Sequence, residues 1–136
     1  MAEVWIPIHE YLGLYEISNQ GNARSIDRIV KINKFGTTYT KTYYGKILAT
    51  KINRNGYVET NLWKNNKGKT YSVHRLVLEN FCPTRNSTLE VNHIDGNKLN
   101  NNLENLEWVT SSQNKLYRSM LRRQMKNKSQ EIITKS

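Results

Sequence analysis

The stretch "VNHIDGNKLNNNLENLEWVTSSQN", residues 91–114, decides the fold of this chain of 136 residues. It places a histidine, His93, beside a glycine turn and among many asparagines. Asparagine is a poor helix and strand former, because its side chain competes with the backbone for hydrogen bonds. The plainer interpretation is a long, well-bonded loop. The sharper interpretation is a site where a base and a metal ion face each other.

The residues around this loop predict its structural frame. "TLEVNH" (88–93) and "LEWVT" (106–110) are strand-like, and "TSSQNKLYRSMLRRQMKNK" (110–128) is helix-like. Thr110 and Gln113 have the spacing of a capping box, in which each side chain bonds the other residue's backbone N–H. The sequence therefore predicts strand, loop, strand and helix in that order.

A further helix is predicted just upstream of the first of these strands. In "SVHRLVLENFC" (72–82) the apolar residues recur at helical spacing, so a short helix can bury one stripe. Pro83 ends it. Trp108 and Cys82 are both expected to be buried, the cysteine as a small hydrophobe.

The first half of the chain predicts short strands separated by turns. "YVETNLW" (57–63) alternates apolar and polar side chains, as a half-buried strand does. Glycine-containing dipeptides between β-branched and aromatic runs are typical of hairpins. These dipeptides are Asn55-Gly56, Gln20-Gly21 and Lys67-Gly68.

One segment of this half, "IVKINKFGTTYTKTYYGK" (29–46), mixes lysines with aromatic residues and threonines. It can be a basic β-ribbon that enters a nucleic-acid groove. It can equally be a solvated edge strand that its lysines protect from aggregation. The sequence leaves both interpretations open.

Charge and composition narrow the class of partner. The 21 Lys and Arg residues exceed the 11 Asp and Glu residues, which leaves a net charge of +10. Such an excess favours a polyanion, because each Lys or Arg that neutralises a phosphate releases counterions. We find no apolar run of about 20 residues for a membrane helix and no secretory signal at the start. We therefore expect a cytoplasmic protein that binds nucleic acid, without a membrane or a small-molecule cofactor.

The single cysteine rules out an intramolecular disulfide and a cysteine-based zinc site. Hydrolysis of a phosphodiester instead needs a base near neutrality and a cation that stabilises the developing charge. His93 suits the first task, because the pKa of an imidazole is about 6.5. Asn92 and Asn114 offer carbonyl oxygens to a hard divalent cation, and Asn105 can hold the loop by bonding its backbone.

These residues resemble a known family. The stretches 72–82 and 91–114 look like the HNH endonucleases with the ββα-metal fold, of the type found in phages and group I intron homing enzymes. The start of the chain, "EVWIPIHEYLGLYEISNQGNARSIDR" (3–28), is similar to the NUMOD4 module that precedes such nuclease domains.

The resemblance implies an α+β fold in three parts. A small β-rich DNA-binding module covers residues 1–70, a ββα-metal nuclease core covers 71–118, and a basic C-terminal helix and tail covers 119–136. It further implies one Mg²⁺ or Mn²⁺ ion per active site and cleavage of double-stranded DNA to 5′-phosphate and 3′-hydroxyl ends. The expected setting is a host cell, where a phage- or intron-encoded protein acts; a monomer and a homodimer both stay open.

Roles for single residues also follow from the resemblance. His93 would be the general base, Asn105 would stiffen the loop and position the histidine, and Asn114 would bind the metal. Asn92 stands where many relatives have a metal-binding aspartate. An amide keeps the coordinating oxygen but lacks the negative charge, so a lower metal affinity is expected.

Other polar residues receive more ordinary interpretations. His74 is expected to be structural or to contact phosphate rather than to catalyse, and His9 has no predicted partner. Asp95 and Asn97, which flank the glycine of a turn, are expected to hold the loop. Basic residues of both halves are expected to contact DNA. They are Lys41, Lys46, Lys51, Arg54, Arg75, Lys98, Lys115, Arg118, Arg122 and Arg123.

The sequence thus predicts a metal-dependent HNH endonuclease of the homing type. Its rival is a catalytically weak or inactive DNA-binding protein that keeps the fold, which the uncharged Asn92 favours. A third interpretation is an RNA-binding module, based on the charge and on tyrosines that could stack on bases. Those tyrosines are Tyr39, Tyr43 and Tyr44.

Overall fold

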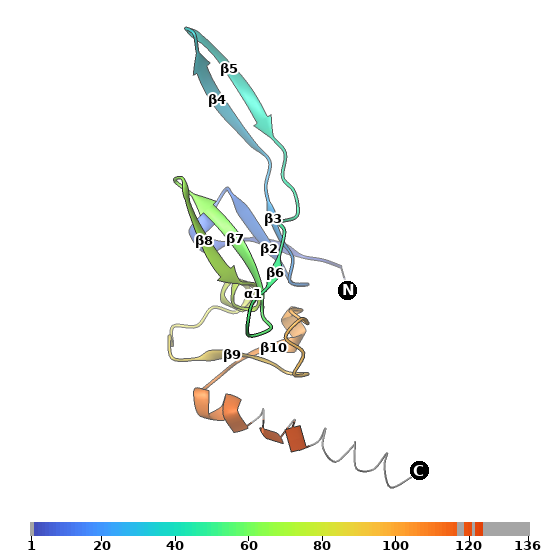
Figure 1. The fold of residues 1–136 in the computed structure, drawn as a ribbon. Coiled ribbons are helices and arrows are strands. Elements are labelled where there is room, and N and C mark those ends of the chain that lie inside the picture. Colours follow the sequence, from blue (N-terminus) through green and yellow to red (C-terminus); the bar gives the residue numbers. More distant parts are fainter. Residues whose placement is uncertain (1, 117–118, 121, 124–136) are drawn as a thin grey trace, which may run out of the picture.

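The computed structural model describes residues 2–116, 119–120 and 122–123, and it has an α+β fold (Figure 1). The strands are β1 (Trp5–Pro7), β2 (Tyr15–Ser18), β3 (Ala23–Ser25), β4 (Arg28–Lys34), β5 (Thr37–Tyr43), β6 (Lys51–Ile52), β7 (Val58–Lys64), β8 (Lys67–Ser72), β9 (Glu90–His93) and β10 (Leu106–Val109). The helices are η1 (His9–Tyr11), α1 (Val73–Phe81) and η2 (Leu103–Asn105), and residues 111–116 are also helical. No helix among the described residues is long and apolar enough to cross a membrane.

The strands form small antiparallel sheets that follow chain order: β1-β2-β3, β4-β5, β6-β7-β8 and β9-β10. Two predicted turns are present, at Gly21 and at Gly56, both with positive φ. The third is wrong, because β7 and β8 are joined by Asn65 and Asn66, with φ of 53° and 62°. Asparagine tolerates this conformation.

Gly68, which is predicted to lie in a turn, is instead a strand residue whose missing side chain allows close packing. It lies inside β8, opposite Trp63. A Cβ atom at position 68 would come within 2.8 Å of the Trp63 ring. The glycine therefore makes room for an indole and does not form a turn.

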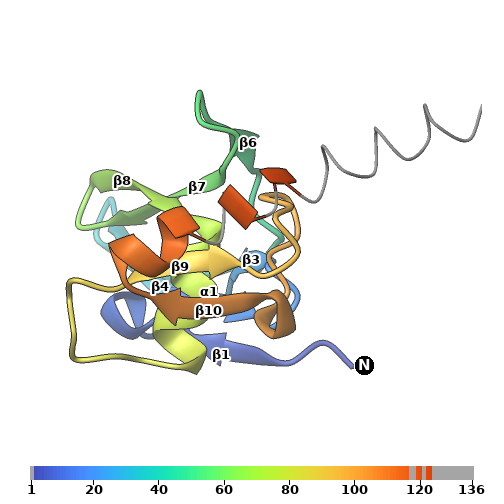
Figure 2. The same ribbon diagram turned by 90° about the horizontal axis from the view of Figure 1, so that it is seen from below.

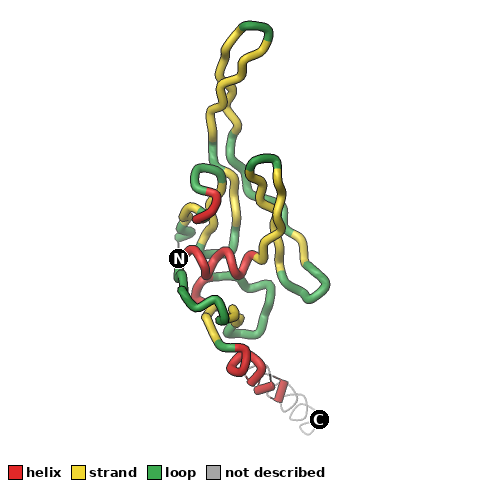
Figure 3. The backbone as a smooth tube through the Cα atoms, turned by 90° about the vertical axis from the view of Figure 1, so that its left-hand side faces the viewer, coloured by secondary structure: helices red, strands yellow, loops and turns green. Residues whose placement is uncertain are grey.

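Helix α1 lies at the centre of the molecule, between the strands of the front half and β9–β10 (Figure 3). Its buried residues Val73 and Val77 belong to the same hydrophobic core as Ile17 of β2 and Leu62 of β7. The predicted helix over 72–82 and its end before Pro83 are confirmed. The two halves thus share one core, while the division at residue 70 stays a prediction.

The end of α1 corrects one expectation. Cys82 is exposed, because it follows the last helical residue and lies outside the apolar stripe. Its backbone N–H donates to the Leu78 carbonyl, and its own carbonyl accepts a hydrogen bond from Trp108 Nε1 at 2.7 Å. Trp108, which is predicted to be buried, is partly buried and packs against the core.

The hairpin β4–β5 projects away from this core (Figure 1). Its strands pair with each other over seven registered positions, and neither belongs to another sheet. The structure shows a free-standing two-stranded ribbon here, and its entry into a nucleic-acid groove stays a prediction. The core therefore positions the nuclease-like part, and the ribbon lies outside it.

Candidate active site

The predicted site is built on β9 and β10, which lie side by side with residues 111–116 next to them (Figure 2). The register sets His93 opposite Leu106 and Asn92 opposite Glu107. The capping box at the start of the following helix is present. The Thr110 N–H donates to Gln113 Oε1 at 2.9 Å, and the Gln113 N–H donates to Thr110 Oγ1 at 3.1 Å.

His93 ends β9 and is buried, with 6% of its surface exposed. Its Nε2 lies 2.8 Å from the Asn101 side-chain oxygen. An amide oxygen only accepts hydrogen bonds, so Nε2 carries the proton and Nδ1 keeps the lone pair in the neutral ring. The contact therefore selects the tautomer in which Nδ1 can act as a base.

Two further rings pack around this imidazole. The His74 ring centroid lies 5.1 Å from that of His93, and the Tyr57 ring lies 4.9 Å from His74 and 6.0 Å from His93. Burial, helped by the charges of His93 and Arg75, lowers the pKa of His74 to about 4. Its Nδ1 is buried and has no hydrogen-bond partner among the described residues. These are the surroundings of a neutral structural ring, one of the interpretations that the sequence allowed.

Asn105 bonds the loop that leads away from His93. Its oxygen accepts from the Asp95 N–H at 3.0 Å, and its Nδ2 donates to Asp95 Oδ1 and to the Asn100 carbonyl, both at 2.9 Å. Asp95 also accepts from the Asn97 N–H at 2.8 Å. Hydrogen bonds from Asn100, Asn97 and Asn105 hold the pKa of the Asp95 carboxyl below its usual value. The loop-holding bonds predicted for these residues are therefore present.

The side chain that hydrogen-bonds the His93 ring is Asn101, and the sequence does not predict this contact. Asn101 is the middle of three consecutive asparagines, and nothing local distinguishes it from its neighbours. What distinguishes it is the front half of the chain. Gly21 lies so close that a Cβ there would meet Asn101 Cβ at 2.8 Å, and the Leu103 N–H donates to the Asn19 carbonyl at 2.8 Å.

The two predicted metal ligands are both buried and both touch a carboxylate. Asn92 Nδ2 donates to Glu107 Oε1 at 3.0 Å, and Asn114 Nδ2 donates to Glu90 Oε2 at 2.9 Å. Glu90 and Asn92 are two residues apart on β9 and so share a face of the sheet. The structure thus brings Asn114, from the helix, to the face that carries Asn92.

This donor set fits a hard divalent cation. Each amide turns its nitrogen toward a carboxylate, which leaves the oxygen outside that bond, and amide and carboxylate oxygens are ligands of Mg²⁺ and similar ions. Residues 2–116 and the described residues beyond them contain no group of three or more His, Cys, Asp or Glu that could hold a metal. A cation here would therefore need ligands besides these four residue types, and the amide oxygens of Asn92 and Asn114 are the predicted ones. His93 projects to the opposite face from Asn92, because neighbours along a strand alternate.

The basic residues predicted to contact DNA are mostly exposed. Those without a close acidic partner in the described part of the chain are Lys41, Lys46, Lys51, Arg54, Lys98, Lys115, Arg122 and Arg123. Lys98 donates to the Asn55 carbonyl at 2.7 Å, beside Arg54, and its ammonium lies 4.7 Å from the Tyr57 ring. Arg118 lies outside the described residues.

Arg75 differs from the other predicted DNA contacts, because it forms an ion pair with Glu79 at 3.1 Å. Both side chains are about half exposed. Arg75 therefore has an intramolecular partner that competes with phosphate.

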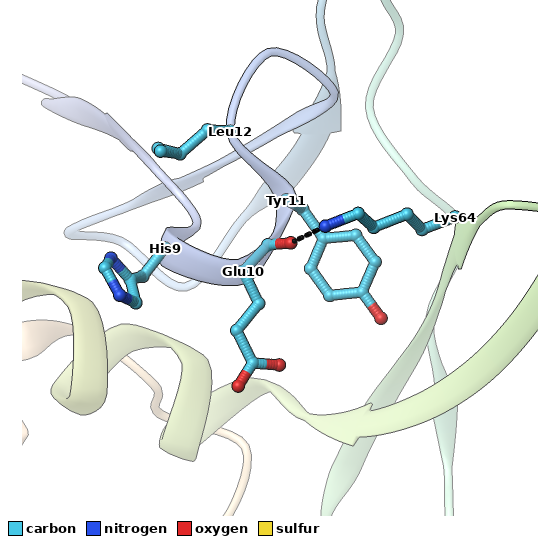
Figure 4. Close-up of a pocket in the computed structure, with 5 residues that line it drawn as sticks. All are labelled: His9, Glu10, Tyr11, Leu12 and Lys64. Atoms are coloured by element: carbon cyan, nitrogen blue, oxygen red, sulfur yellow. Dashed lines mark hydrogen bonds between the residues drawn. The ribbon is translucent and has the colours of Figure 1, made fainter.

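A pocket of about 440 Å³ lies elsewhere, lined by η1 and Lys64 (Figure 4). Lys64 Nζ donates to the Glu10 carbonyl at 2.9 Å and lies along the Tyr11 ring. His9, without a predicted partner, lines this pocket, and its N–H donates to Asn80 Oδ1. None of the predicted catalytic or metal residues lines it, so we do not place the chemistry there.

Comparison with known proteins agrees with this arrangement. Residues 3–63 match the NUMOD4 motif and residues 71–116 match the HNH endonuclease family. The chain is 40% identical over 110 residues to DNA endonuclease I-HmuI of Bacillus phage SP01, which covers 81% of this chain and 54% of that protein. It is 42% identical over 86 residues to an uncharacterized HNH endonuclease of Acanthamoeba polyphaga mimivirus, 63% of this chain and 26% of that one.

A solved structure that describes DNA binding and cleavage by the HNH homing endonuclease I-HmuI matches with a TM-score of 0.64 and 36% identity. The match covers 96% of this chain and 66% of that chain. In the sequence comparison, the chain spans about half the length (54%) of the curated phage relative. HNH endonucleases generally use a divalent metal ion. This chain belongs to the HNH endonucleases, with a NUMOD4 motif in front of its HNH domain.

Proposed function

We propose that this chain is a DNA endonuclease of the homing type that hydrolyses a phosphodiester in double-stranded DNA. The observation that carries the proposal is the buried His93, which Asn101 holds in the tautomer with a free Nδ1 lone pair. The net charge of +10 favours a polyanionic substrate. The relative I-HmuI, whose solved structure matches this chain, binds and cleaves DNA.

His93 would act as the general base. Its Nδ1 takes a proton from the attacking water, and Nε2 keeps its hydrogen bond to Asn101 through the step, because both nitrogens donate in the imidazolium form. The neutral His74 at 5.1 Å adds no second positive charge that would oppose this protonation. Asn105 keeps the loop in place through its bonds to Asp95 and Asn100. The products would carry 5′-phosphate and 3′-hydroxyl ends.

Asn92 and Asn114 would hold one Mg²⁺ or Mn²⁺ ion. Glu107 and Glu90, which bond the two amides, would orient them and supply negative charge that the amides lack. A bound divalent ion would stabilise the charge that develops on the phosphoryl and leaving oxygens. Because His93 and Asn92 are consecutive but face opposite sides of the sheet, the scissile phosphate would approach at the end of β9.

The test is cleavage of supercoiled plasmid DNA by the purified protein, with Mg²⁺ or with EDTA. His93→Ala should lower the cleavage rate by about 10²–10⁴-fold, as loss of a general base does, and leave DNA affinity nearly unchanged. His9→Ala, at an exposed histidine, serves as the matched control and should cleave as the wild type does. Wild-type cleavage by His93→Ala, or full activity in EDTA, contradicts the mechanism.

A second candidate is a DNA-binding protein that keeps the fold without cleaving. The observation that favours it is the amide at position 92, which binds cations more weakly than a carboxylate. The result that would support it is tight DNA binding with no cleavage in either Mg²⁺ or Mn²⁺. Detectable metal-dependent cleavage that His93→Ala abolishes excludes it.

Asn92→Asp tests the metal site with a readout other than activity. The new carboxylate would face Glu107 across the strands, so the metal-free variant should melt at a lower temperature than the wild type. Mg²⁺ should raise the melting temperature of the variant more than that of the wild type, because ligand charge increases cation affinity. A variant whose melting temperature does not respond to Mg²⁺ would remove Asn92 from the ligand set.

A further inference from the structure

We propose that Tyr57 is a positioning residue for the general base His93, and that Lys98 holds Tyr57 in place. The tyrosine would fix the plane of the imidazole, while Asn101 selects its tautomer. The inference deepens the proposed function and rests on His93 acting as the base. It also gives Lys98 a role within the protein, where the sequence predicts a DNA contact.

A single hydrogen bond does not fix the orientation of the His93 ring. The contact between Nε2 and Asn101 holds one atom of the ring. The torsion that turns a histidine ring about its Cβ–Cγ bond has broad minima, so the ring can tilt while the hydrogen bond bends. A general base must present its lone pair within hydrogen-bond reach of the attacking water. The faces of the ring therefore need support from other side chains.

Two neighbouring rings give this support from different angles. The Tyr57 ring stacks on that of His93, with 6.0 Å between the centroids and 29° between the planes. The His74 ring lies 5.1 Å from His93 and is tilted by 59°. Tyr57 and His74 also contact each other, with 4.9 Å between their centroids. These distances are those of ordinary aromatic pairs, so a tilt of the His93 imidazole would have to displace a neighbour.

The position of Tyr57 is not explained by the hydrophobic core. Among the described residues, three tyrosines are partly buried: Tyr15, Tyr57 and Tyr71. Tyr15 and Tyr71 pack against the core, whereas Tyr57 does not belong to it. Tyr57 contacts the two imidazoles and the Lys98 ammonium instead. We therefore assign its ring to the active site.

The backbone that leads to Tyr57 is a tightly bonded turn, residues 53–57. Asn53 Oδ1 accepts from the Asn55 N–H at 2.9 Å and from the Tyr57 N–H at 3.1 Å. The Asn53 N–H donates to the Tyr57 carbonyl at 2.8 Å, and its carbonyl accepts from the Gly56 N–H at 3.0 Å. Gly56 has φ of 87°, a conformation that glycine adopts readily. The turn thus holds the Tyr57 backbone in one place.

Lys98 ties this turn to the loop that follows His93. Its Nζ donates to the Asn55 carbonyl at 2.7 Å and lies 4.7 Å from the centre of the Tyr57 ring. The face of an aromatic ring attracts a cation. Lys98 belongs to the same loop as Asn101, three residues before it. The loop that presents the hydrogen-bond partner of His93 is therefore bonded to the turn that presents its stacking partner.

The first experiment separates the cleavage rate of the bound complex from DNA affinity. Single-turnover cleavage is measured with Mg²⁺ at saturating protein, on the plasmid that the wild type cleaves. Affinity is measured in EDTA on a labelled fragment of that plasmid. Tyr57→Leu should lower the rate by about 10- to 100-fold, as a small displacement of a reacting group does, and leave affinity nearly unchanged. Tyr57→Phe keeps the ring and should cleave nearly as fast as the wild type.

Tyr71→Leu is the matched control for Tyr57→Leu. It makes the same change at a partly buried tyrosine, whose ring pairs with that of Tyr11 at 5.7 Å and packs against the core. This control should lower the melting temperature and keep the cleavage rate of the wild type. A rate lost in Tyr57→Leu alone is therefore not a consequence of lower stability.

The second experiment decides between the two roles of Lys98. If Lys98 holds Tyr57, Lys98→Met should slow cleavage at saturating protein several-fold and leave the salt dependence of DNA affinity unchanged. A phosphate contact would instead lower the slope of log affinity against log salt by about 0.9 and leave that rate unchanged. Lys67→Met, at an exposed lysine of β8, is the control and should keep the cleavage rate.

The outcomes also separate this inference from the proposed function. If the wild type does not cleave, or His93→Ala cleaves equally fast, the proposed function fails and the inference fails with it. If cleavage needs His93 but Tyr57→Leu matches the wild type, the inference is wrong and the endonuclease stands. The same holds if Tyr57→Phe is as slow as Tyr57→Leu, because the hydroxyl and not the ring would then act. If Lys98→Met changes only the salt dependence, Lys98 contacts phosphate and does not hold Tyr57.

Discussion

The hairpins β4–β5 and β7–β8 have similar local chemistry and different positions in the molecule. Both turn through two residues with positive φ, Phe35-Gly36 in one and Asn65-Asn66 in the other. In β7, Leu62 is fully buried, whereas no residue of β4 is. Turn chemistry therefore determines that a hairpin forms, and it does not determine where the hairpin goes.

The difference comes from how charge is distributed over the two faces. Leu62 shares its face with Val58 and Thr60, which lie against the core. The charge on this face, Lys64, stands at the end of the strand and donates to the Glu10 carbonyl at 2.9 Å. In β4 the apolar residues are divided between faces, with Ile29 beside Lys31 on one and Ile32 beside Lys34 on the other. Burying either face would desolvate a charge without a partner, at a large cost. We therefore expect a ribbon of this kind to stay in solvent in the free protein.

The largest expected effect is a difference in stability between substitutions in β7 and in β4. Leu62→Ala should lower the free energy of unfolding by about 2–5 kcal/mol, because it removes buried atoms and leaves a cavity. Ile29→Ala, at a side chain 72% exposed, should change it by no more than about 0.5 kcal/mol. Urea denaturation of both variants measures the difference. Similar losses would mean that the hairpin packs on the protein after all.

The next effect concerns the buried imidazole of His74 in helix α1. The pKa of His74 is about 4 in the folded state against a usual 6.5, so the unfolded state binds its proton first as the pH falls. Its stabilisation is complete above about pH 6.5 and is lost on the way down to pH 4, by on the order of 3 kcal/mol. His74→Leu should flatten this part of the pH profile of stability, and exposed His9→Leu should not. An unchanged slope in His74→Leu contradicts the assignment.

A smaller effect tests how the front half supports the site. Gly21→Ala should destabilise by about 1–3 kcal/mol, since alanine is strained at φ +82° and its Cβ would meet Asn101 at 2.8 Å. It should also slow cleavage, because Asn101 holds His93. Gly13→Ala is the matched control, with φ +80° and no atom within 4 Å. It should share the strain and leave cleavage unchanged; equal cleavage by both variants would show that the two halves are not coupled here.

The smallest effect is expected on the outer side of α1. Glu79→Gln removes the exposed ion pair with Arg75 and should change stability by less than about 0.5 kcal/mol. Because it frees Arg75 for phosphate, DNA affinity should rise slightly at low salt. Reduced affinity measured by fluorescence anisotropy would mean that Arg75 does not contact DNA.

Several features could be predicted from the sequence because their causes are local. The apolar stripe of α1 and the proline after it set the helix over Val73–Phe81. The capping box of Thr110 and Gln113 depends on residues three apart. The resemblance to HNH endonucleases depends on such local stretches, and the family matches confirm it. The roles of Asn92 and Asn114 as metal ligands stay predictions.

Two predictions about other features are wrong. The prediction of a buried Cys82 is wrong for a local reason, because the helix ends at Phe81 and the cysteine lies outside its apolar stripe. The prediction of a turn at Lys67-Gly68 is wrong, because the indole that needs the glycine lies on the neighbouring strand. The sequence around Gly68 does not show that Trp63 packs against it, because strand pairing brings the two together.

The sequence alone determined that this chain has a histidine where a strand meets an asparagine-rich loop, followed by a second strand and a capped helix, with a surplus of positive charge. Only the tertiary structure decided which asparagine holds the imidazole, because Asn100, Asn101 and Asn102 are chemically identical. Their difference arises because Gly21, about eighty residues away in the chain, packs so closely against Asn101 that it leaves no room for a Cβ atom at position 21. Side-chain identity sets what an atom can donate or accept, and packing between distant segments sets which atom receives the partner.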